Sequence, residues 1–479
     1  MLECCSGYIY HYHAHTLYLV KMMNYQQYFK GKKIIMLGLG LLGRGIGVAK
    51  FLAEQGAILT ITDLKTKKEL APALKKLKKY KGINYVLGGH QLVDFSAQGG
   101  PASGGPNMVI KAAGVPLNSP FVAEARKNNI PIKMDASLFL ELAPKIISVG
   151  VTGTRGKSTV TQLIYTIIKN HLKSKKNDHR QVYLGGNVRG LATLPLLKKI
   201  KKGDIVVFEL DSWQLQGFGD YKVSPNIAVF TNLMPYHLNY YQGSMKQYFY
   251  DKVNIYRWQT EKDFLVVGKT ISPLIRKNGR RRSKLIESGP IDSSLKSKLL
   301  GKHNLENIKL AIIVAGLLKI PEPIIKPVVE SFKGVPGRLE LVREVKGVRY
   351  YNDTTATMPE ATLAALKALS QYQGKIILIG GGNDKALDYK KYATAVSNSV
   401  KKLILFSGLA TDKIKSLLPP KFKKNIIDAG SMTEAVSKAV AVATEGDVII
   451  LSPGATSFGL FKNEYDRGDQ FVNLVKKLK

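Results

Sequence analysis

Short apolar runs alternate with amphipathic stretches along most of this chain. The first run, Ile34 to Leu37, leads into a glycine-rich turn, a helical stretch and a second apolar run that ends at Asp63. Comparable runs end at Val149 and at Glu209. Strands that alternate with helices in this way are typical of parallel sheets. The pattern therefore predicts an α/β protein.

The length of 479 residues is too great for one hydrophobic core, and ~150 residues per domain suggests about three domains. We expect a Rossmann-like domain over residues 25–138, a central P-loop-type ATPase domain with a mostly parallel sheet over 139–334, and a C-terminal Rossmann-like α/β domain over 335–479. No apolar stretch reaches the ~20 residues that a bilayer crossing needs, so we expect a soluble protein with no membrane partner.

Residues 1–24 lack the basic start and the long apolar core of a signal peptide. We expect a poorly ordered leader, with translation naturally starting at Met22 or Met23. The only two cysteines, Cys4 and Cys5, lie in this leader together with a His-x-His-x-His pattern, so a metal site is the alternative interpretation. The absence of cysteine from the rest of the chain favours a reducing, cytoplasmic location.

The formal charge of +37 raises the question of nucleic acid binding. The lysines and arginines are spread over nearly every helical stretch, and no helix-turn-helix, RRM or zinc-finger pattern accompanies them. We therefore expect a solvated basic surface and no specific nucleic acid partner. Such a surface would also attract small polyanionic substrates.

A G-x-G-x-x-G pattern, Gly38, Gly40 and Gly43, follows the first apolar run, and Asp63 stands twenty residues after the last glycine. This is the Rossmann arrangement, in which the glycines let a pyrophosphate approach a helix N-terminus and the acid accepts from a ribose or base. Taken alone, the pattern suggests a nicotinamide-dependent oxidoreductase. It does not identify the nucleotide.

A second phosphate-binding pattern, VTGTRGKSTVT, begins at Val151, where a strict Walker A motif would have glycine. Gly153 and Gly156 still free backbone N–H groups to face phosphate, Lys157 can reach the outer phosphates, and Ser158 can bind Mg²⁺.

Further polar candidates lie downstream at the ends of apolar runs and on a helical stretch. Glu209, His237 and Lys252 also have simpler interpretations: a helix-capping acid, a loop histidine and a solvated lysine. Open α/β sheets bind ligands at the carboxyl ends of their strands. Three such ends in the last third of the chain carry Asp353, Lys385 and Ser457.

Taken together and in this order, the motifs resemble those of the Mur ligases, the ATP-dependent amide ligases of peptidoglycan precursor synthesis. The resemblance extends from about Lys32 to the C-terminus. It rests on TGTRGKSTVT, GGN (185–187), ELDSWQL, TNLMPYHLNYY, GKHNLENIKLA, PGRLE, NDTTAT and SPGATSFGLFKNEYDRG.

The resemblance implies a reaction and its cofactors. ATP would phosphorylate the carboxylate of UDP-N-acetylmuramoyl-L-alanine, and the amine of D-glutamate would then attack the acyl phosphate. Two anions must meet in the first step, so cations do most of the work. The implied cofactors are ATP and Mg²⁺, with Lys252 in a carbamylated form that can help to hold the metal. The implied enzyme is a cytoplasmic monomer.

The resemblance also assigns the site residues. The implied catalytic residues are Lys157, Glu209, His237 and Lys252, and the implied Mg²⁺ ligands are Ser158, Glu209, His237 and Lys252. ATP contacts are implied for Gly153, Thr154, Arg155, Gly156, Lys157, Ser158, Thr159, Asn304, Arg338 and Asp353. UDP-substrate contacts are implied for Gly38, Gly40, Leu41, Leu42, Gly43, Asp63 and Asn187. The acceptor carboxylates would meet Lys385 and Ser457.

Three residues depart from the family pattern. Arg155 stands where Asn or a small polar residue is usual, Thr355 where many relatives carry Lys, and Glu464 where an aromatic is usual. The last two bear on the acceptor. Another Mur or folylpolyglutamate-type ligase is therefore the alternative within the class, and an oxidoreductase or a basic nucleic-acid-binding ATPase the alternative outside it. We also expect the third segment to close onto the second during turnover.

Overall fold

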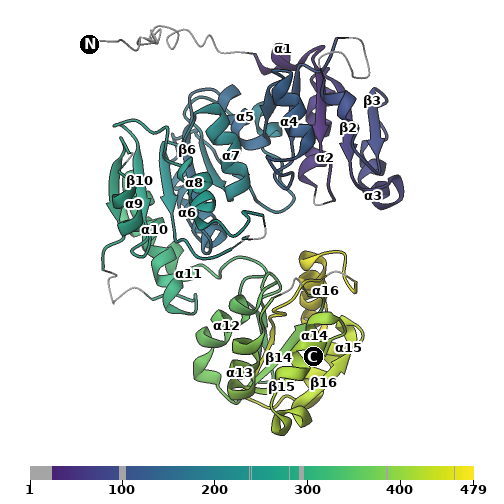
Figure 1. Cartoon of the computed structure of the whole chain (residues 1–479). Helices are drawn as coiled ribbons and strands as arrows, with labels where there is room; N and C mark the ends of the chain where they lie inside the picture. Colours follow the sequence, from purple (N-terminus) through teal and green to yellow (C-terminus); the bar gives the residue numbers. More distant parts are fainter. Residues whose placement is uncertain are drawn as a thin grey trace, which may run out of the picture.

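The computed structural model in Figure 1 describes residues 24–479 except 42, 97–103, 237, 239, 280, 291–295, 385–386 and 458. The predicted leader therefore lies almost wholly outside the described residues. Three β-sheets follow one another along the chain, each flanked by helices, which confirms the predicted α/β class.

The first sheet has the strand order β3-β2-β1-β4-β5, and all its pairs are parallel. This is the predicted Rossmann-like arrangement. The helix between the second and third strands begins with a capping box between Thr66 and Glu69, which satisfies two free N–H groups of its first turn. The elements are α1 (Tyr25–Phe29), β1 (Lys33–Leu37), α2 (Arg44–Glu54), β2 (Ile58–Asp63), α3 (Lys67–Leu77), β3 (Ile83–Leu87), η1 (Leu92–Phe95), β4 (Met108–Lys111), α4 (Pro120–Lys127) and β5 (Ile132–Lys133).

The second sheet, in the order β11-β10-β9-β6-β8-β7, is also wholly parallel. Its central strands are buried on both faces and read as continuous apolar runs, as parallel strands do. The elements are α5 (Asp135–Leu142), β6 (Ile147–Thr152), α6 (Lys157–Ser174), β7 (Val182–Gly186), η2 (Leu194–Lys198), β8 (Ile205–Glu209), α7 (Ser212–Tyr221), β9 (Ile227–Phe230), α8 (Met245–Val253), β10 (Phe264–Val267), α9 (Ser272–Asn278), β11 (Lys284–Glu287), α10 (Lys302–Leu317) and α11 (Glu322–Ser331).

The third sheet, in the order β12-β13-β17-β14-β15-β16, is parallel except at one edge, where β12 runs antiparallel to β13. Lys346 and Gly347 join these two strands, both with positive φ, as a two-residue hairpin turn requires. The elements are β12 (Glu340–Val345), β13 (Val348–Asn352), α12 (Pro359–Ala368), η3 (Ser370–Tyr372), β14 (Ile376–Gly381), α13 (Lys390–Ser399), β15 (Val400–Phe406), α14 (Leu409–Leu417), η4 (Pro420–Asn425), β16 (Ile426–Ala429), α15 (Met432–Val442), β17 (Val448–Leu451) and α16 (Glu464–Lys477).

The hydrophobic cores show how the three sheets are joined. One cluster of buried residues runs from the first sheet through α5 into one face of the second sheet, whereas the third sheet packs within clusters of its own. The predicted boundary at residue 138 falls inside α5, a helix of that shared cluster. The third part of the chain therefore meets the rest through its linker, through polar contacts and through a small apolar contact in which Leu300 packs against the third sheet's cluster.

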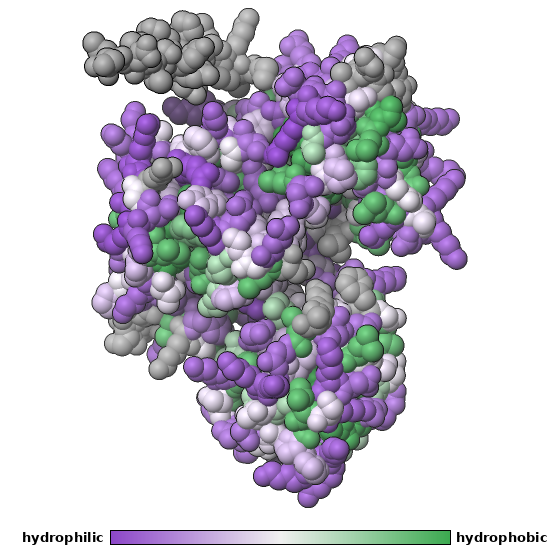
Figure 2. All heavy atoms as spheres, in the orientation of Figure 1, coloured by the Kyte–Doolittle hydropathy of each residue, from purple (hydrophilic) through white to green (hydrophobic). Residues whose placement is uncertain are grey.

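The surface agrees with the dispersed charge of the sequence. Figure 2 shows hydrophilic side chains over all three parts of the visible face, with smaller apolar areas between them. Within the described part of the chain, no helix is both long enough and apolar enough to cross a membrane.

Candidate active site

The loop between β6 and α6 has a shape that only glycine permits at two positions. Gly153 has φ 142° and Gly156, the residue that caps α6, has φ 82°. A Cβ atom at Gly153 would lie 1.9 Å from Oγ1 of Thr231, and one at Gly156 would lie 2.3 Å from Oδ1 of Asn307. The loop is therefore packed closely against its neighbours. Its glycines leave the backbone at the helix N-terminus uncovered for an anion.

The residues that follow β9 hold this loop in place. The backbone N–H of Arg155 donates to Oδ1 of Asn232 at 2.9 Å, and that of Thr154 donates to the Asn232 carbonyl at 3.0 Å. The Thr231 hydroxyl donates to the Arg155 carbonyl at 2.6 Å. The Arg155 side chain takes no part in these bonds, and its guanidinium lies 5.4 Å from the ring centroid of Tyr236.

Lys157 folds back over the same loop. Its Nζ donates to the carbonyls of Gly153 at 3.0 Å and Thr154 at 3.1 Å. Burial lowers the pKa of Lys157, and the opposing charge of Glu209 only partly offsets that effect. The ammonium therefore stands at the mouth of the loop, where an outer phosphate would meet it, as the sequence predicts. Thr159, two residues further along α6, is buried.

Two of the predicted metal ligands meet at the carboxyl ends of neighbouring strands. The Ser158 hydroxyl donates to Oε1 of Glu209 at 2.9 Å, and Val151 of β6 pairs with Glu209 of β8. A hydroxyl and a carboxylate are oxygen ligands of the kind that Mg²⁺ takes in phosphate sites, so the pair fits that ion. No group of three or more His, Cys, Asp and Glu side chains suited to a metal occurs among the described residues. His237, the third predicted ligand, lies outside them.

Lys252 is buried, with 1% of its surface exposed, so its interpretation as a solvated lysine is wrong. Its Nζ donates to the Gly153 carbonyl at 2.9 Å and to the Thr152 hydroxyl at 3.3 Å. Burial, reinforced by the charge of Lys157, lowers the pKa of Lys252 well below its usual value. The neighbouring Asp251 bonds to Gln216 and Tyr241, so within the described residues its carboxylate makes no hydrogen bond to this amine.

Glu209 does not serve as a helix cap, which was its simpler interpretation. Asp211 takes that position at the start of α7, where its side chain accepts from the backbone N–H of Gln214 at 2.8 Å. The carboxylate of Glu209 is left to face Ser158 across the sheet edge.

The carboxylate of Asp63 accepts hydrogen bonds from the backbone of the glycine turn in the first sheet. The Asp63 carboxylate accepts from the backbone N–H groups of Leu39 at 2.8 Å, Gly40 at 3.0 Å and Lys65 at 2.9 Å. Burial raises the pKa of Asp63, but these N–H groups outweigh it and hold that pKa below its usual value. A contact from this carboxylate to a ribose or base stays a prediction.

The other predicted residues of this turn differ in exposure. Gly38, Gly40 and Gly43 all have positive φ, as a tight turn requires. Leu41 is exposed, and Leu42 lies outside the described residues.

Asn187 links the first sheet to the second. Its Oδ1 accepts from Nη2 of Arg44 at 2.7 Å, and its backbone N–H donates to the Glu209 carbonyl at 2.6 Å. Arg44 is the first residue of α2, directly after the glycine turn, so its charge stands at the helix terminus that the sequence predicts to bind phosphate. The sequence analysis did not include Arg44, although a cation directly after G-x-G-x-x-G was the available signal.

The third part of the chain brings Asp353 to a buried position after β13. Its carboxylate accepts from the backbone N–H of Leu339 at 3.0 Å and from the Ser452 hydroxyl at 2.8 Å. Burial raises the pKa of Asp353 to about 7, and the charge of Arg338 opposes that rise. The charge of Arg338 also lowers the pKa of Lys157, although burial and Glu209 have larger effects on that pKa. Arg338 therefore acts on Lys157 of the central part as well as on Asp353 of the third part.

Asn304 supports the phosphate loop from behind. Its Oδ1 accepts from Nδ2 of Asn307 at 2.9 Å, and Asn307 is the residue against which Gly156 packs. The Asn304 amide donates to the Leu300 carbonyl at 2.8 Å.

The predicted acceptor residues are only partly described. Ser457 is buried, and Lys385 lies outside the described residues. Thr355 turns away from solvent, with its hydroxyl and its backbone N–H both donating to the Gly337 carbonyl, at 3.0 and 3.1 Å. Glu464 takes part through its backbone, whose carbonyl accepts from the Thr354 hydroxyl at 2.6 Å.

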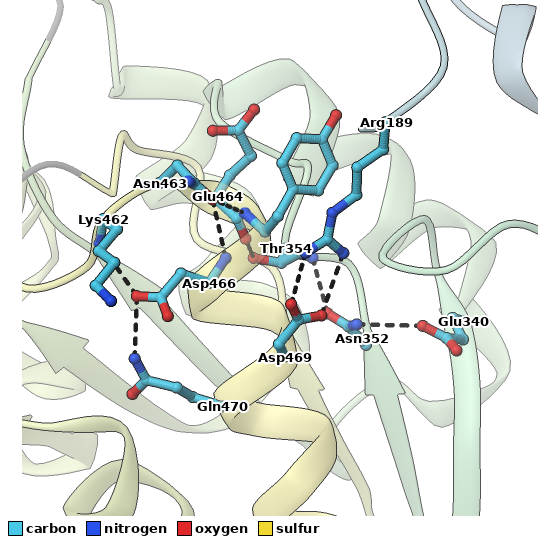
Figure 3. Close-up of polar contacts among 11 residues, drawn as sticks. Arg189, Glu340, Asn352, Thr354, Lys462, Asn463, Glu464, Asp466, Asp469 and Gln470 are labelled. Atoms are coloured by element: carbon cyan, nitrogen blue, oxygen red, sulfur yellow. Dashed lines mark hydrogen bonds and ion pairs between the residues drawn. The ribbon is translucent and has the colours of Figure 1, made fainter. Parts of the chain in front are cut away.

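Figure 3 shows a contact between the second and third parts of the chain that the sequence analysis missed. Arg189, in the loop after β7, donates from Nη2 and Nη1 to the two oxygens of Asp469 on α16, at 2.6 and 3.2 Å. Its guanidinium also lies 4.5 Å from the ring centroid of Tyr465, one turn earlier on the same helix.

Comparisons with known proteins agree with these motifs. Sequence models of the Mur ligase middle domain and of the Mur ligase glutamate ligase domain match residues 151–289 and 337–454. Proteins named UDP-N-acetylmuramoylalanine--D-glutamate ligase are similar to nearly the whole chain. The Roseiflexus sp. (strain RS-1) protein is 34% identical over 93% of this chain and 98% of its own, and the Borreliella burgdorferi (strain ZS7) protein is 32% identical over 94% and 98%.

Solved structures show the same fold at lower identity. UDP-N-acetylmuramate-alanine ligase MurC of Thermotoga maritima superposes with a TM-score of 0.59 at 19% identity, covering 94% of this chain and 100% of its own. E. coli FolC in complex with ADP gives a TM-score of 0.52 at 15% identity, covering 71% and 91%. The full-length relatives and the two domain models establish that the chain belongs to the Mur ligase family.

Proposed function

We propose that this protein is the ATP-dependent ligase that adds D-glutamate to UDP-N-acetylmuramoyl-L-alanine in peptidoglycan precursor synthesis. The observation that carries the proposal is the group at the carboxyl ends of β6 and β8, where Lys157, Ser158, Glu209 and Lys252 surround one phosphate loop. Relatives that carry this name match more than nine tenths of the chain, which supports the acceptor as well as the reaction class.

The reaction forms and breaks bonds in two steps. A carboxylate oxygen of the UDP substrate attacks the γ-phosphorus of ATP, and ADP leaves with the bridging oxygen. The acceptor amine then attacks the acyl carbon, loses a proton, and phosphate leaves with the oxygen that came from the carboxylate. The cations of Lys157 and Arg155 lower the repulsion between the two anions in the first step. Ser158 and Glu209, together with His237 as the sequence predicts, would hold Mg²⁺, which would supply further positive charge.

Lys252 is proposed to be carbamylated. Only a neutral amine adds to CO₂, and burial lowers the pKa of Lys252 well below its usual value. The product carries a negative charge, which would suit a site that already holds Lys157 and a divalent cation. The test is the ¹³C NMR spectrum of the full-length protein in labelled bicarbonate. A carbamate signal that is lost in Lys252→Arg and kept in Lys157→Arg supports the proposal, and its absence from the wild type would refute it.

The substrates are assigned to three regions. Gly38, Gly40, Leu41, Leu42, Gly43, Asp63 and Asn187 are proposed for the UDP substrate. Gly153, Thr154, Arg155, Gly156, Lys157, Ser158, Thr159, Asn304, Arg338 and Asp353 are proposed for ATP, and Lys385 and Ser457 for D-glutamate. The predicted domain boundaries, a monomeric state and a cytoplasmic location belong to the same proposal.

A second acceptor is favoured by one observation. Thr355 stands where the family resemblance implies a lysine near the acceptor, and its hydroxyl instead donates to the Gly337 carbonyl. The alternative function is therefore the same ligase chemistry with a different amino acid.

Phosphate release distinguishes these functions. The protein is incubated with ATP, Mg²⁺ and UDP-N-acetylmuramoyl-L-alanine, and D-glutamate is compared with L-glutamate, D-lysine, D-alanine and meso-diaminopimelate. Release with D-glutamate alone supports the proposal. Release with another amino acid supports the alternative, and no release with any of them refutes both.

A further inference from the structure

The loop after β7 touches both other parts of the chain. Asn187 accepts from Arg44 of the first part, and two residues later Arg189 pairs with Asp469 of the third. The backbone N–H of Asn187 also donates to the carbonyl of Glu209, the proposed metal ligand. One short loop at the reacting edge of the central sheet therefore contacts the helix that carries Asp469.

Arg189 contacts two side chains on one face of α16. Tyr465 and Asp469 are four residues apart, so both side chains project from the same side of the helix. The guanidinium pairs with both oxygens of Asp469 and lies over the ring of Tyr465, a combination that a planar arginine can make and a lysine cannot. The contact therefore fixes the orientation of the helix as well as its distance.

The same helix is tied to two third-part loops that carry proposed site residues. Arg467 is buried, and its guanidinium donates to the carbonyl of Thr354 at 2.8 Å and to the carbonyl of Ala455 at 3.3 Å. Thr354 directly follows Asp353, and Ala455 is two residues before Ser457. A shift of α16 would therefore move the ATP-contacting acid and the proposed acceptor serine together.

We propose that Arg189 is a positioning residue that docks α16, and with it the loops of Asp353 and Ser457, against the edge of the central sheet where the acyl phosphate forms. This inference rests on the proposed ligase function. The third sheet has hydrophobic clusters of its own, and of the central part only Leu300 is among the described residues packed against them, so a polar contact of this kind contributes to the orientation between the two parts. The docking should affect the attack of the amine more than the binding of ATP, because the phosphate loop belongs to the central part and only Arg338 and Asp353 of the proposed ATP contacts lie in the third.

The side chains of Arg189 and Asp469 are 49% and 57% exposed, which makes the contact sensitive to salt. A contact that ions in solution can weaken is suited to an interface between two domains that separate to release product. The wild-type KM for the acceptor should therefore rise with ionic strength, and variants without the pair should lose that dependence.

The test is a double-mutant cycle on the full chain with Arg189→Gln, Asp469→Asn and the double variant. Each single change should raise the acceptor KM by about fivefold, the ratio that ~1 kcal/mol gives, and the double variant should cost little more than either. The KM for ATP should rise less than the KM for the acceptor, because Asp353 moves with α16 but the phosphate loop does not. The scrambling of the β,γ-bridging oxygen of ATP without acceptor, which reports the first step alone, should likewise change less than the acceptor KM. The charge swap Arg189→Asp with Asp469→Arg should recover part of the loss.

Arg276→Gln is the matched control. Arg276 is a 63% exposed arginine that pairs with Glu287 of β11, at the edge of the second sheet opposite to β7. It should leave the acceptor KM unchanged. Additive effects of the two single changes, or equal effects on the KM for ATP and for acceptor, would overturn the inference. A wild-type enzyme that releases no phosphate with any acceptor would instead refute the proposed function, so the two failures are distinguishable.

Discussion

The hydroxyl of Ser158 donates to Oε1 of Glu209 at 2.9 Å, so the first residues of α6 and the last residue of β8 meet at one point. Glu209→Gln keeps the size of the side chain but removes its charge. We expect this variant to lose activity by about a hundredfold or more, because the site loses the anion that would hold a divalent cation beside the ATP phosphates. The measurement is kcat as a function of Mg²⁺ concentration.

The matched control for this prediction is a second serine–glutamate contact in the same sheet. Ser272 on α9 donates to Glu287, at the end of β11. Glu287→Gln should leave the Mg²⁺ dependence as it is in the wild type. If Glu209→Gln also keeps that dependence, the assignment of the metal to Glu209 is wrong.

Gly153→Ala should unfold the loop that binds phosphate. The new Cβ would lie 1.9 Å from Oγ1 of Thr231, and the φ of 142° is one that alanine rarely adopts. We expect a loss of roughly 2 kcal/mol or more in the free energy of unfolding, together with the loss of ATP binding.

Gly279→Ala separates backbone strain from overlap. Gly279 also has a positive φ, 61°, but no atom of the described residues beyond its chain neighbours lies within 4 Å of its added Cβ. Its cost should be only ~1 kcal/mol, as expected for a single left-handed residue, with ATP binding unchanged. Equal midpoints of urea unfolding for the two variants would show that the contact with Thr231 is unimportant.

Asp353 should make stability depend on pH. Burial raises its pKa from 3.8 to about 7 in the folded protein, so folding favours the protonated form. That contribution is complete below the unfolded pKa, near 4, and is lost as the pH rises through about 7. The free energy of unfolding of the wild type, measured relative to Asp353→Asn, should therefore fall across this range. A difference in the free energy of unfolding between wild type and Asp353→Asn that does not change with pH would contradict a raised pKa for Asp353.

Arg155→Asn tests whether the unusual residue of the phosphate loop acts through its side chain. The backbone of Arg155 makes the bonds that hold the loop, so the free energy of unfolding should stay unchanged. Among the described residues no ion pair or hydrogen bond engages the guanidinium, which leaves its charge for the transferred phosphoryl group. We expect kcat to fall by about tenfold or more, with partial recovery in Arg155→Lys. An unchanged kcat would show that the Arg155 side chain has no role in phosphoryl transfer.

The parts of the site that lie close together in sequence could be predicted from it. The phosphate loop is one continuous motif, so its glycines, Lys157 and Ser158 were found directly. The hairpin at Lys346 and Gly347, which makes the third sheet mixed, was missed, although two turn residues between alternating runs are a usual signal for it.

Contacts between distant segments could not be predicted in this way. Arg44 meets Asn187 and Arg189 meets Asp469 only because parts of the chain with separate sheets come together, and no spacing rule links residues so far apart. Burial was equally invisible. The sequence around Lys252 predicts a surface lysine on an amphipathic helix. In the structure this helix packs against the phosphate loop, and Lys252 is buried there.

The most direct test of the account follows one oxygen atom. UDP-N-acetylmuramoyl-L-alanine labelled with ¹⁸O in its carboxylate is converted with ATP, Mg²⁺ and D-glutamate, and the released phosphate is analysed by mass spectrometry. If the carboxylate attacks ATP, the phosphate must carry one labelled oxygen, because that oxygen leaves with phosphorus when the amide forms. Labelled amide together with unlabelled phosphate would contradict the acyl phosphate and with it the role assigned to this site.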